Sequence, residues 1–127
     1  MIAIASAIIA AAVLFALSVL QILVAIGEPY GAFVYGGQHR ILPQSLRIMS
    51  AVTVVLYISF ATVLFARAGI LPGQDAPFIR AATWVLFAFS ALSIAINAVS
   101  PSRPERLTAT PASAILSITI LALALAA

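Results

Sequence analysis

The chain has 127 residues, of which 65% are hydrophobic and 7% are charged, and its net charge is +3. Soluble domains carry about 25% charged residues, and a water-soluble fold of this size cannot bury so much apolar side chain. The long unbroken apolar runs exclude a β-barrel, whose strands alternate, so the predicted fold is all-α, a four-helix transmembrane bundle forming one membrane domain over residues 1–127.

The residue types exclude several classes of function. The chain lacks cysteine, which excludes disulfide exchange, thiolate metal sites and cysteine nucleophiles. A single histidine cannot supply the paired axial ligands of a membrane haem protein or a multi-histidine metal site. The six basic residues are scattered arginines without a basic run, so the sequence does not indicate nucleic-acid binding. No cofactor is predicted.

Four apolar stretches are long enough to cross a bilayer, which requires about 20 residues. Glycine and proline punctuate the segments between them. Gly27 and Pro29 are expected to end the first helix, and Asp75 is expected to be the N-cap of the third. The approximate bounds of the predicted spans are 2–26, 43–67, 76–98 and 103–126.

The start of the fourth span allows two interpretations. Ser102 and Glu105 have the spacing of a capping box, which would begin a helix there and bend it near Pro111. Alternatively, Thr110 caps a new helix from Pro111 that is short for a span. We favour one continuous helix from about Arg103.

The segment 27–47 is distinct from the apolar chain around it. It holds the only histidine, four of the six glycines and two of the three tyrosines. Gly36 and Gly37 suggest a tight turn with positive φ or a close backbone approach. Because long connections are uncommon in compact domains, we expect a structured loop between the first two helices that enters the membrane interface or folds over the bundle end.

No ionisable side chain falls in the middle of a predicted span. This argues against a proton-driven pump or antiporter, because such proteins place carboxylates or histidines inside the membrane. Polar side chains do share helical faces, and they could line a pore or pocket or serve as interhelical hydrogen-bonding groups. The two faces are Ser50, Thr53 and Tyr57 in the second span, and Ser90, Ser93 and Asn97 in the third.

Small residues recur at helical spacing in the first span. Such rows let helix backbones approach closely in lipid, within one chain or between subunits, although simple alanine richness would give the same pattern. The rows consist of Ala3, Ala7 and Ala11, and of Ala12 and Ala16.

The arginines predict an orientation in a bacterial plasma membrane. With four spans, the first and third loops lie on one side, and the second loop and both termini lie on the other. Short cytoplasmic loops carry an excess of arginine, so we expect the first and third loops inside and both termini outside. The first side carries Arg40, Arg47, Arg103 and Arg106, and the second carries Arg67 and Arg80.

The predicted cytoplasmic side also gathers the candidate binding residues. Glu28 and Glu105 can neutralise two of its arginines, which leaves positive charge beside two helix N-termini and suits a phosphate, a carboxylate or a lipid head group. The alternative is that the arginines only fix the topology. The predicted ligand-binding residues are Glu28, Tyr35, Gln38, His39, Arg40, Arg47, Asn97, Arg103, Glu105 and Arg106.

Three segments resemble a family of small four-helix bacterial membrane proteins. They are 27–31, 36–47 with its Gly-Gly-Gln-His-Arg-Ile-Leu-Pro run, and 97–106 with its Ser-Pro-Ser-Arg-Pro-Glu-Arg run. The family has no established activity, so the resemblance implies no reaction or substrate. It does imply that the first and third loops act together on one side of the membrane.

These features favour a non-enzymatic integral membrane protein that binds a small anionic or amphipathic ligand, or a lipid head group, at the arginine-bearing side. The expected partners are the lipid bilayer and a homo-oligomer or larger membrane complex. An oligomeric small-solute channel or transporter is the alternative. A membrane enzyme that uses His39 with Glu28 is the less favoured third hypothesis.

Overall fold

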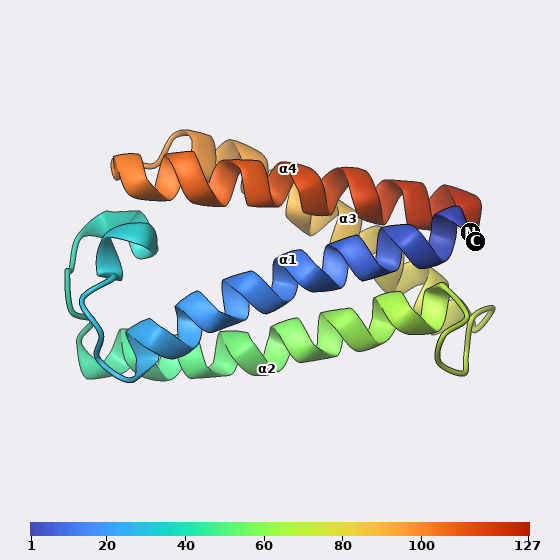
Figure 1. Cartoon of the computed structure of the whole chain (residues 1–127), viewed down its shortest axis with the longest axis horizontal. Coiled ribbons are helices and arrows are strands. Elements are labelled where there is room, and N and C mark those ends of the chain that lie inside the picture. Colours follow the sequence, from blue (N-terminus) through green and yellow to red (C-terminus); the bar gives the residue numbers. More distant parts are fainter.

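The computed structural model describes all 127 residues. Four packed helices make the fold, and each is long and apolar enough to cross a membrane. This confirms the predicted all-α, four-helix architecture. Two short 3-10 helices lie in the 18-residue loop between the first two long helices (Figure 1). The elements are α1 (Ile2–Ala25), η1 (Gly31–Phe33), η2 (Tyr35–Gly37), α2 (Gln44–Arg67), α3 (Pro77–Ala98) and α4 (Arg103–Ala126).

Glycines end the first two long helices. Gly27 has a φ of 97°, its N–H donates to the carbonyl of Val24, and the next N–H, of Glu28, donates to the carbonyl of Leu23. This is the Schellman arrangement, which satisfies carbonyls that lack an intrahelical partner. Gly69 ends α2 in the same way, with a φ of 84°. The predicted helix end at Gly27 is confirmed.

The predicted N-cap of α3 is wrong. The helix begins at Pro77 with Ala76 as its N-cap, and no side chain caps it. The carboxylate of Asp75 instead lies 2.9 Å from Arg80 and 3.7 Å from Arg67. The Asp75 carboxylate therefore pairs with guanidinium groups and caps no backbone N–H group of α3.

The capping box at the start of α4 does not form, although Ser102 is the N-cap residue. The Ser102 hydroxyl donates to the carbonyl of Ala32 in the first loop. The Glu105 carboxylate accepts from the Gly36 N–H and from the Ser100 hydroxyl. Groups of the first loop thus bond the side chains of Ser102 and Glu105, which the sequence spacing predicted to cap the helix. The helix itself continues through Pro111, as favoured above.

The four helices pack closely at one end of the molecule and diverge at the other. In Figure 1, α1 lies beside α4 near the two termini and beside α2 near the first loop. α2 packs only weakly against α3. The main buried core, which joins all four helices, consists of Ala7, Ala10, Leu14, Leu64, Ala68, Leu86, Leu116, Ile120 and Leu123. The first loop covers the diverging end and packs through Val34 and Leu42 on Val24.

Small residues let α1 approach its neighbours within the chain. Ala7 and Ala10 are completely buried in the core, and Ala3 packs against it. The second alanine row faces outward, since Ala12 and Ala16 are exposed. The close approach expected for the first row is therefore an intramolecular helix seam.

Candidate ligand cavity

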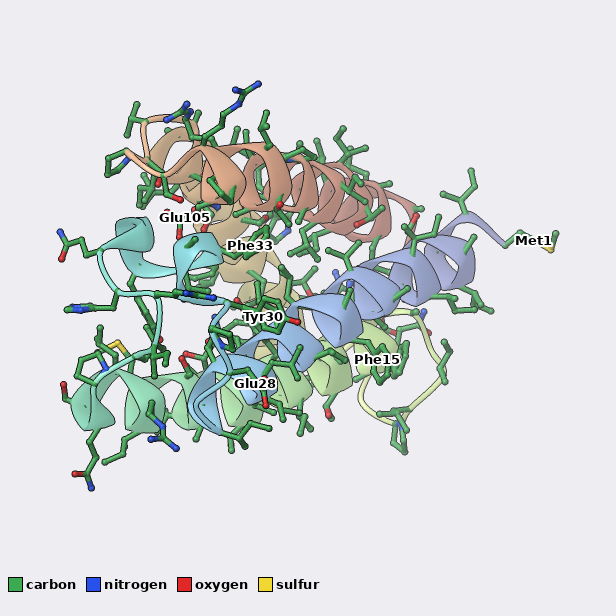
Figure 2. The ribbon with its side chains drawn as sticks, turned by 60° about the vertical axis from the view of Figure 1, so that its left-hand side comes forward. Met1, Phe15, Glu28, Tyr30, Phe33 and Glu105 are labelled. Atoms are coloured by element: carbon green, nitrogen blue, oxygen red, sulfur yellow. The ribbon has the colours of Figure 1, made fainter.

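A cavity of about 350 Å³ lies in the space between the diverging helices. Its floor is the top of the main core, including Leu14, Leu64 and Leu116. Its cover is the first loop, which contributes the segment from Phe33 to Gly36. Figure 2 shows Phe33 and Glu105 together at this end of the molecule. The cavity exists because the loop bridges the two helix pairs without filling the space beneath it.

Polar side chains from all four helices and the loop reach the cavity among its apolar lining. The Asn97 amide on α3 donates to the Ser113 hydroxyl on α4 at 2.8 Å, which joins these helices at the cavity wall. The Gln21 amide oxygen is buried and has no hydrogen-bond partner, although an unpaired buried acceptor costs about 1–3 kcal/mol. The polar lining residues are Gln21, Tyr35, Tyr57, Ser90, Ser93, Asn97, Glu105, Thr108 and Ser113.

The cover of the cavity has an unusual backbone. Tyr35 is the only residue other than glycine with a positive φ, 50°, which is uncommon for a bulky side chain. Its hydroxyl lies 3.0 Å from the Ser50 hydroxyl on α2, which fixes the ring. Gly36 and Gly37 follow with φ of 72° and 70°, and a Cβ on Gly37 would lie only 2.5 Å from that of Ser102. The expected tight glycine turn is confirmed, and it sets the loop directly against α4.

Glu105 links this cover to α4. The Oε1 atom accepts from the Gly36 N–H at 3.2 Å and from the Ser100 hydroxyl at 2.5 Å. No arginine lies within ion-pair distance of Glu105 or of Glu28, because the only ion pairs in the chain join Asp75 to Arg67 and Arg80. The expected neutralisation of two loop arginines by these glutamates is therefore not found.

The four arginines at this end lie outside the cavity lining. The Arg47 Nε donates at 2.8 Å to the carbonyl of Ala25, in the last turn of α1, where carbonyls lack helical partners and a positive charge is favourable. Arg106 donates at 2.8 Å to the carbonyl of Ser100. Arg40 and Arg103 are exposed. Two of these arginines thus hold the backbone, and two face outward.

Three of the ten predicted binding residues, Tyr35, Asn97 and Glu105, line the cavity together. His39 and Glu28 are both exposed, and no hydrogen bond or ion pair joins them. The predicted residues outside the lining are Glu28, Gln38, His39, Arg40, Arg47, Arg103 and Arg106.

The predicted polar faces of the second and third spans meet only in part. Tyr57 shares the cavity with the whole polar face of α3. Ser50 bonds Tyr35 instead, and the Thr53 hydroxyl donates to its own helix at Met49. Gln21, Thr108 and Ser113 also line the cavity and were not among the predicted binding residues. Gln21 had a signal, because it is the only amide side chain in the first span.

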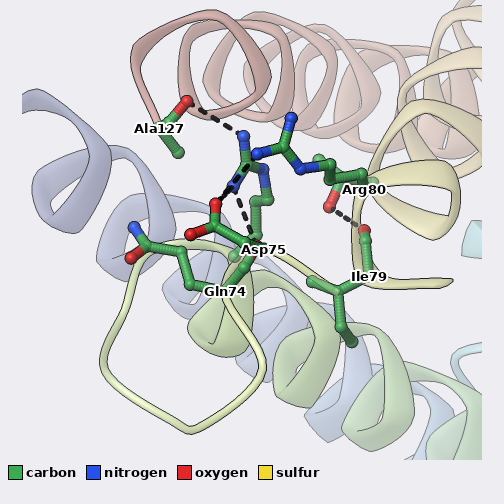
Figure 3. Close-up of polar contacts among 7 residues, drawn as sticks. Gln74, Asp75, Ile79, Arg80 and Ala127 are labelled. Atoms are coloured by element: carbon green, nitrogen blue, oxygen red, sulfur yellow. Dashed lines mark hydrogen bonds and ion pairs between the residues drawn. The ribbon is translucent and has the colours of Figure 1, made fainter. Parts of the chain in front are cut away.

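The other end of the molecule is closed by a buried arginine. Arg67 is only 5% exposed. Its guanidinium group donates at 2.9 Å to the carbonyls of Gln74 and Ala127. Figure 3 shows Gln74, Asp75, Arg80 and Ala127 gathered at this end. The Asp75 carboxylate lies within ion-pair distance of both Arg67 and Arg80. The second loop and the end of α4 are therefore fastened to α2 at this end.

The cavity contains no group of three or more histidine, cysteine, aspartate or glutamate side chains that could hold a metal ion, nor does the rest of the chain.

Comparison of the chain with family models, with curated proteins and with solved structures finds no match. The resemblance to a bacterial membrane protein family stays a prediction, and what the chain is shown to be is a small protein with four helices suited to span a membrane.

Proposed function

We propose that this four-span membrane protein is a non-enzymatic binding protein that takes a small amphipathic molecule into the cavity under the first loop. The observation that carries the proposal is the composition of the lining, in which 15 of 23 residues are hydrophobic, Tyr35 and Tyr57 included, and polar groups converge from every helix. Ligand pockets combine these features, with volumes of about 300–1,000 Å³. The unpaired Gln21 amide oxygen offers an acceptor to a bound polar group.

The location of the cavity favours a ligand that arrives through the bilayer. Phe89 and Ile96 on α3 line the cavity and are also exposed on the molecular surface. The Phe89 ring lies 6.0 Å from the Phe60 ring on α2, and α2 and α3 pack only weakly against each other. A molecule dissolved in the membrane would meet this wall first, which suits an apolar body with a polar head.

An amphipathic ligand has more support than an anion held by the loop arginines. Arg47 and Arg106 already donate to backbone carbonyls, and the exposed Arg40 and Arg103 face outward, where we propose that they contact lipid phosphates. A channel through one chain has less support, because the buried core fills the half of the bundle opposite the cavity.

The proposal can be tested by filling the cavity. Ser93 lines it, and its hydroxyl donates only to its own helix at Phe89. In Ser93→Phe, we expect the phenyl ring to occupy the ligand space and to weaken saturable binding of tritiated 8-phenyloctanol at least about tenfold. Binding would be measured by equilibrium dialysis against protein in phosphatidylcholine nanodiscs, with empty nanodiscs subtracted.

Ser59→Phe is the matched control. Ser59 is exposed on α2, and its hydroxyl makes the same kind of bond to its own helix, at Val55. We expect the control to bind the probe as the unmodified protein does. Equal binding by both variants, or no saturable binding by any of the three proteins, would contradict the proposed function.

A further inference from the structure

We propose that the cavity selects amphipathic organic cations, with an amine or quaternary ammonium head on an apolar body, and that Glu105 is the anionic partner of the head. This inference rests on the proposed function, and it names the class of ligand that the same cavity prefers.

The first observation is the charge of the lining. Glu105 is the only aspartate, glutamate, arginine or histidine among the 23 lining residues. It forms no ion pair. Both of its hydrogen bonds reach the same oxygen, Oε1, so the second carboxylate oxygen makes no hydrogen bond within the chain. A carboxylate beside an apolar cavity favours a cation, because desolvation strengthens attraction between opposite charges.

The second observation is the number of aromatic rings around the same space. Aromatic faces attract ammonium groups, and quaternary ammonium recognition commonly uses several rings. Two rings come from the cover and three from the helices: Phe33, Tyr35, Tyr57, Phe60 and Phe89. A carboxylate together with aromatic rings offers a cationic head both a counter-ion and favourable ring faces.

Other charges near Glu105 oppose this preference only in part. The α4 N-terminus carries partial positive charge, equivalent to about half an elementary charge, and Glu105 lies in its first turn. Arg106 donates to the Ser100 carbonyl and does not line the cavity. Arg103 is exposed and forms no ion pair with Glu105, and water weakens the field of an exposed charge. The helix end does not cancel the carboxylate, so the lining stays negative.

The test compares three probes that share one apolar body. They are 8-phenyloctyl-trimethylammonium, 8-phenyloctanol and 8-phenyloctanoate, each measured by dialysis against the protein in nanodiscs of an uncharged glycolipid, which has no ammonium head group to compete with the cation. We expect the cation to bind about tenfold more tightly than the alcohol, and the carboxylate to bind most weakly. In Glu105→Gln, the affinity for the cation should fall about tenfold relative to the affinity for the alcohol, a difference of about 1.4 kcal/mol.

Two further variants separate a charge effect from damage to the cover. Thr108 is exposed and lines the cavity, so Thr108→Lys places a cation there, one turn from Glu105. The substitution leaves the Glu105 side chain and its hydrogen bonds in place. It should abolish the preference for the cation. Glu28→Gln removes an exposed carboxylate outside the cavity and should change nothing.

The outcomes distinguish the two proposals. If the alcohol binds and Ser93→Phe blocks it, but the unmodified protein does not prefer the cation, the cation inference is overturned and the binding function stands. An unchanged preference in both Glu105→Gln and Thr108→Lys also overturns it. If no probe binds saturably, both proposals fail.

Discussion

Arg67 and Arg80 share one carboxylate, yet their surroundings make them unequal. Arg67 is almost fully buried and also donates to two carbonyl groups. The Arg80 side chain is 55% exposed, and its partner Asp75 is 77% exposed. Exposed ion pairs contribute about 0–1 kcal/mol, whereas leaving a buried polar group without a partner costs about 1–3 kcal/mol. The stability at this end of the molecule should therefore depend on Arg67 far more than on Arg80.

Replacement of Arg67 by glutamine tests this difference. Glutamine is too short to reach both carbonyl oxygens at 2.9 Å, so we expect the free energy of unfolding to fall by about 2–3 kcal/mol. Arg80→Gln, which loses only the contact with Asp75, should change it by less than about 0.5 kcal/mol. Urea unfolding in detergent micelles, followed by circular dichroism, would measure both. Equal midpoints for the two variants would contradict the assignment.

The loop between α1 and α2 is an ordered element that covers the cavity. Its fold depends on a close backbone approach at Gly31, whose N–H donates at 2.8 Å to the carbonyl of Arg40. A Cβ at Gly31 would overlap the carbonyl oxygen of His39 and would lie 2.7 Å from that of Arg40. Since backbone atoms cannot yield as a flexible side chain does, this position requires glycine.

Gly31→Ala should loosen the loop, and trypsin can report the change. Arg40 is exposed within the loop, and its carbonyl is the group that Gly31 holds. We expect cleavage after Arg40 to become about tenfold faster, because strain of this kind costs about 1–3 kcal/mol. Gly73→Ala is the control. It strains a glycine with positive φ in the second loop, and it should leave the rate of cleavage after Arg40 unchanged. An unaltered rate in Gly31→Ala would show that the contact does not hold the loop.

The sequence predicted the elements well and their polar contacts poorly. The helix bounds follow from apolar runs that end at local signals such as Gly27 and Pro77, so no tertiary knowledge is needed. Asp75 and Ser102 have the right positions for caps, but other partners hold their side chains: Asp75 pairs with Arg80 at 2.9 Å and with Arg67 at 3.7 Å, and Ser102 bonds the first loop. Such competition cannot be read from spacing.

The cavity follows from the arrangement of the whole molecule. Most of the predicted binding residues are charged and lie in the first and third loops, which places them at the cavity end but outside the cavity lining. Gln21 lines the cavity only because α1 leaves α4 before reaching the loop. The crossing of α1 between its two neighbours depends on packing at Ala7 and Ala10. The alanine spacing indicated Ala7 but neither Ala10 nor the partner helices.

The two ends of the molecule differ in charge as well as in packing, and this predicts the orientation in the membrane. The cavity end has four arginines and the closed end two. If only arginines that make no hydrogen bond to the backbone are counted, the cavity end has two, Arg40 and Arg103, and the closed end has one, Arg80. Both counts favour the same result, with the cavity end in the cytoplasm. The structural use of Arg47, Arg67 and Arg106 therefore does not reverse the expectation.

Single cysteines can test this orientation, because the chain has none of its own. Gln38 and Pro72 are exposed in the first and second loops, at opposite ends of the molecule. In intact bacterial spheroplasts, a membrane-impermeant maleimide should label Pro72→Cys directly and Gln38→Cys only after permeabilisation. The reverse pattern would place the arginine-rich end outside the cell. A bilayer-borne ligand could still reach the cavity through the wall at α2 and α3, so that result would reject the orientation and leave the binding proposal to its own test.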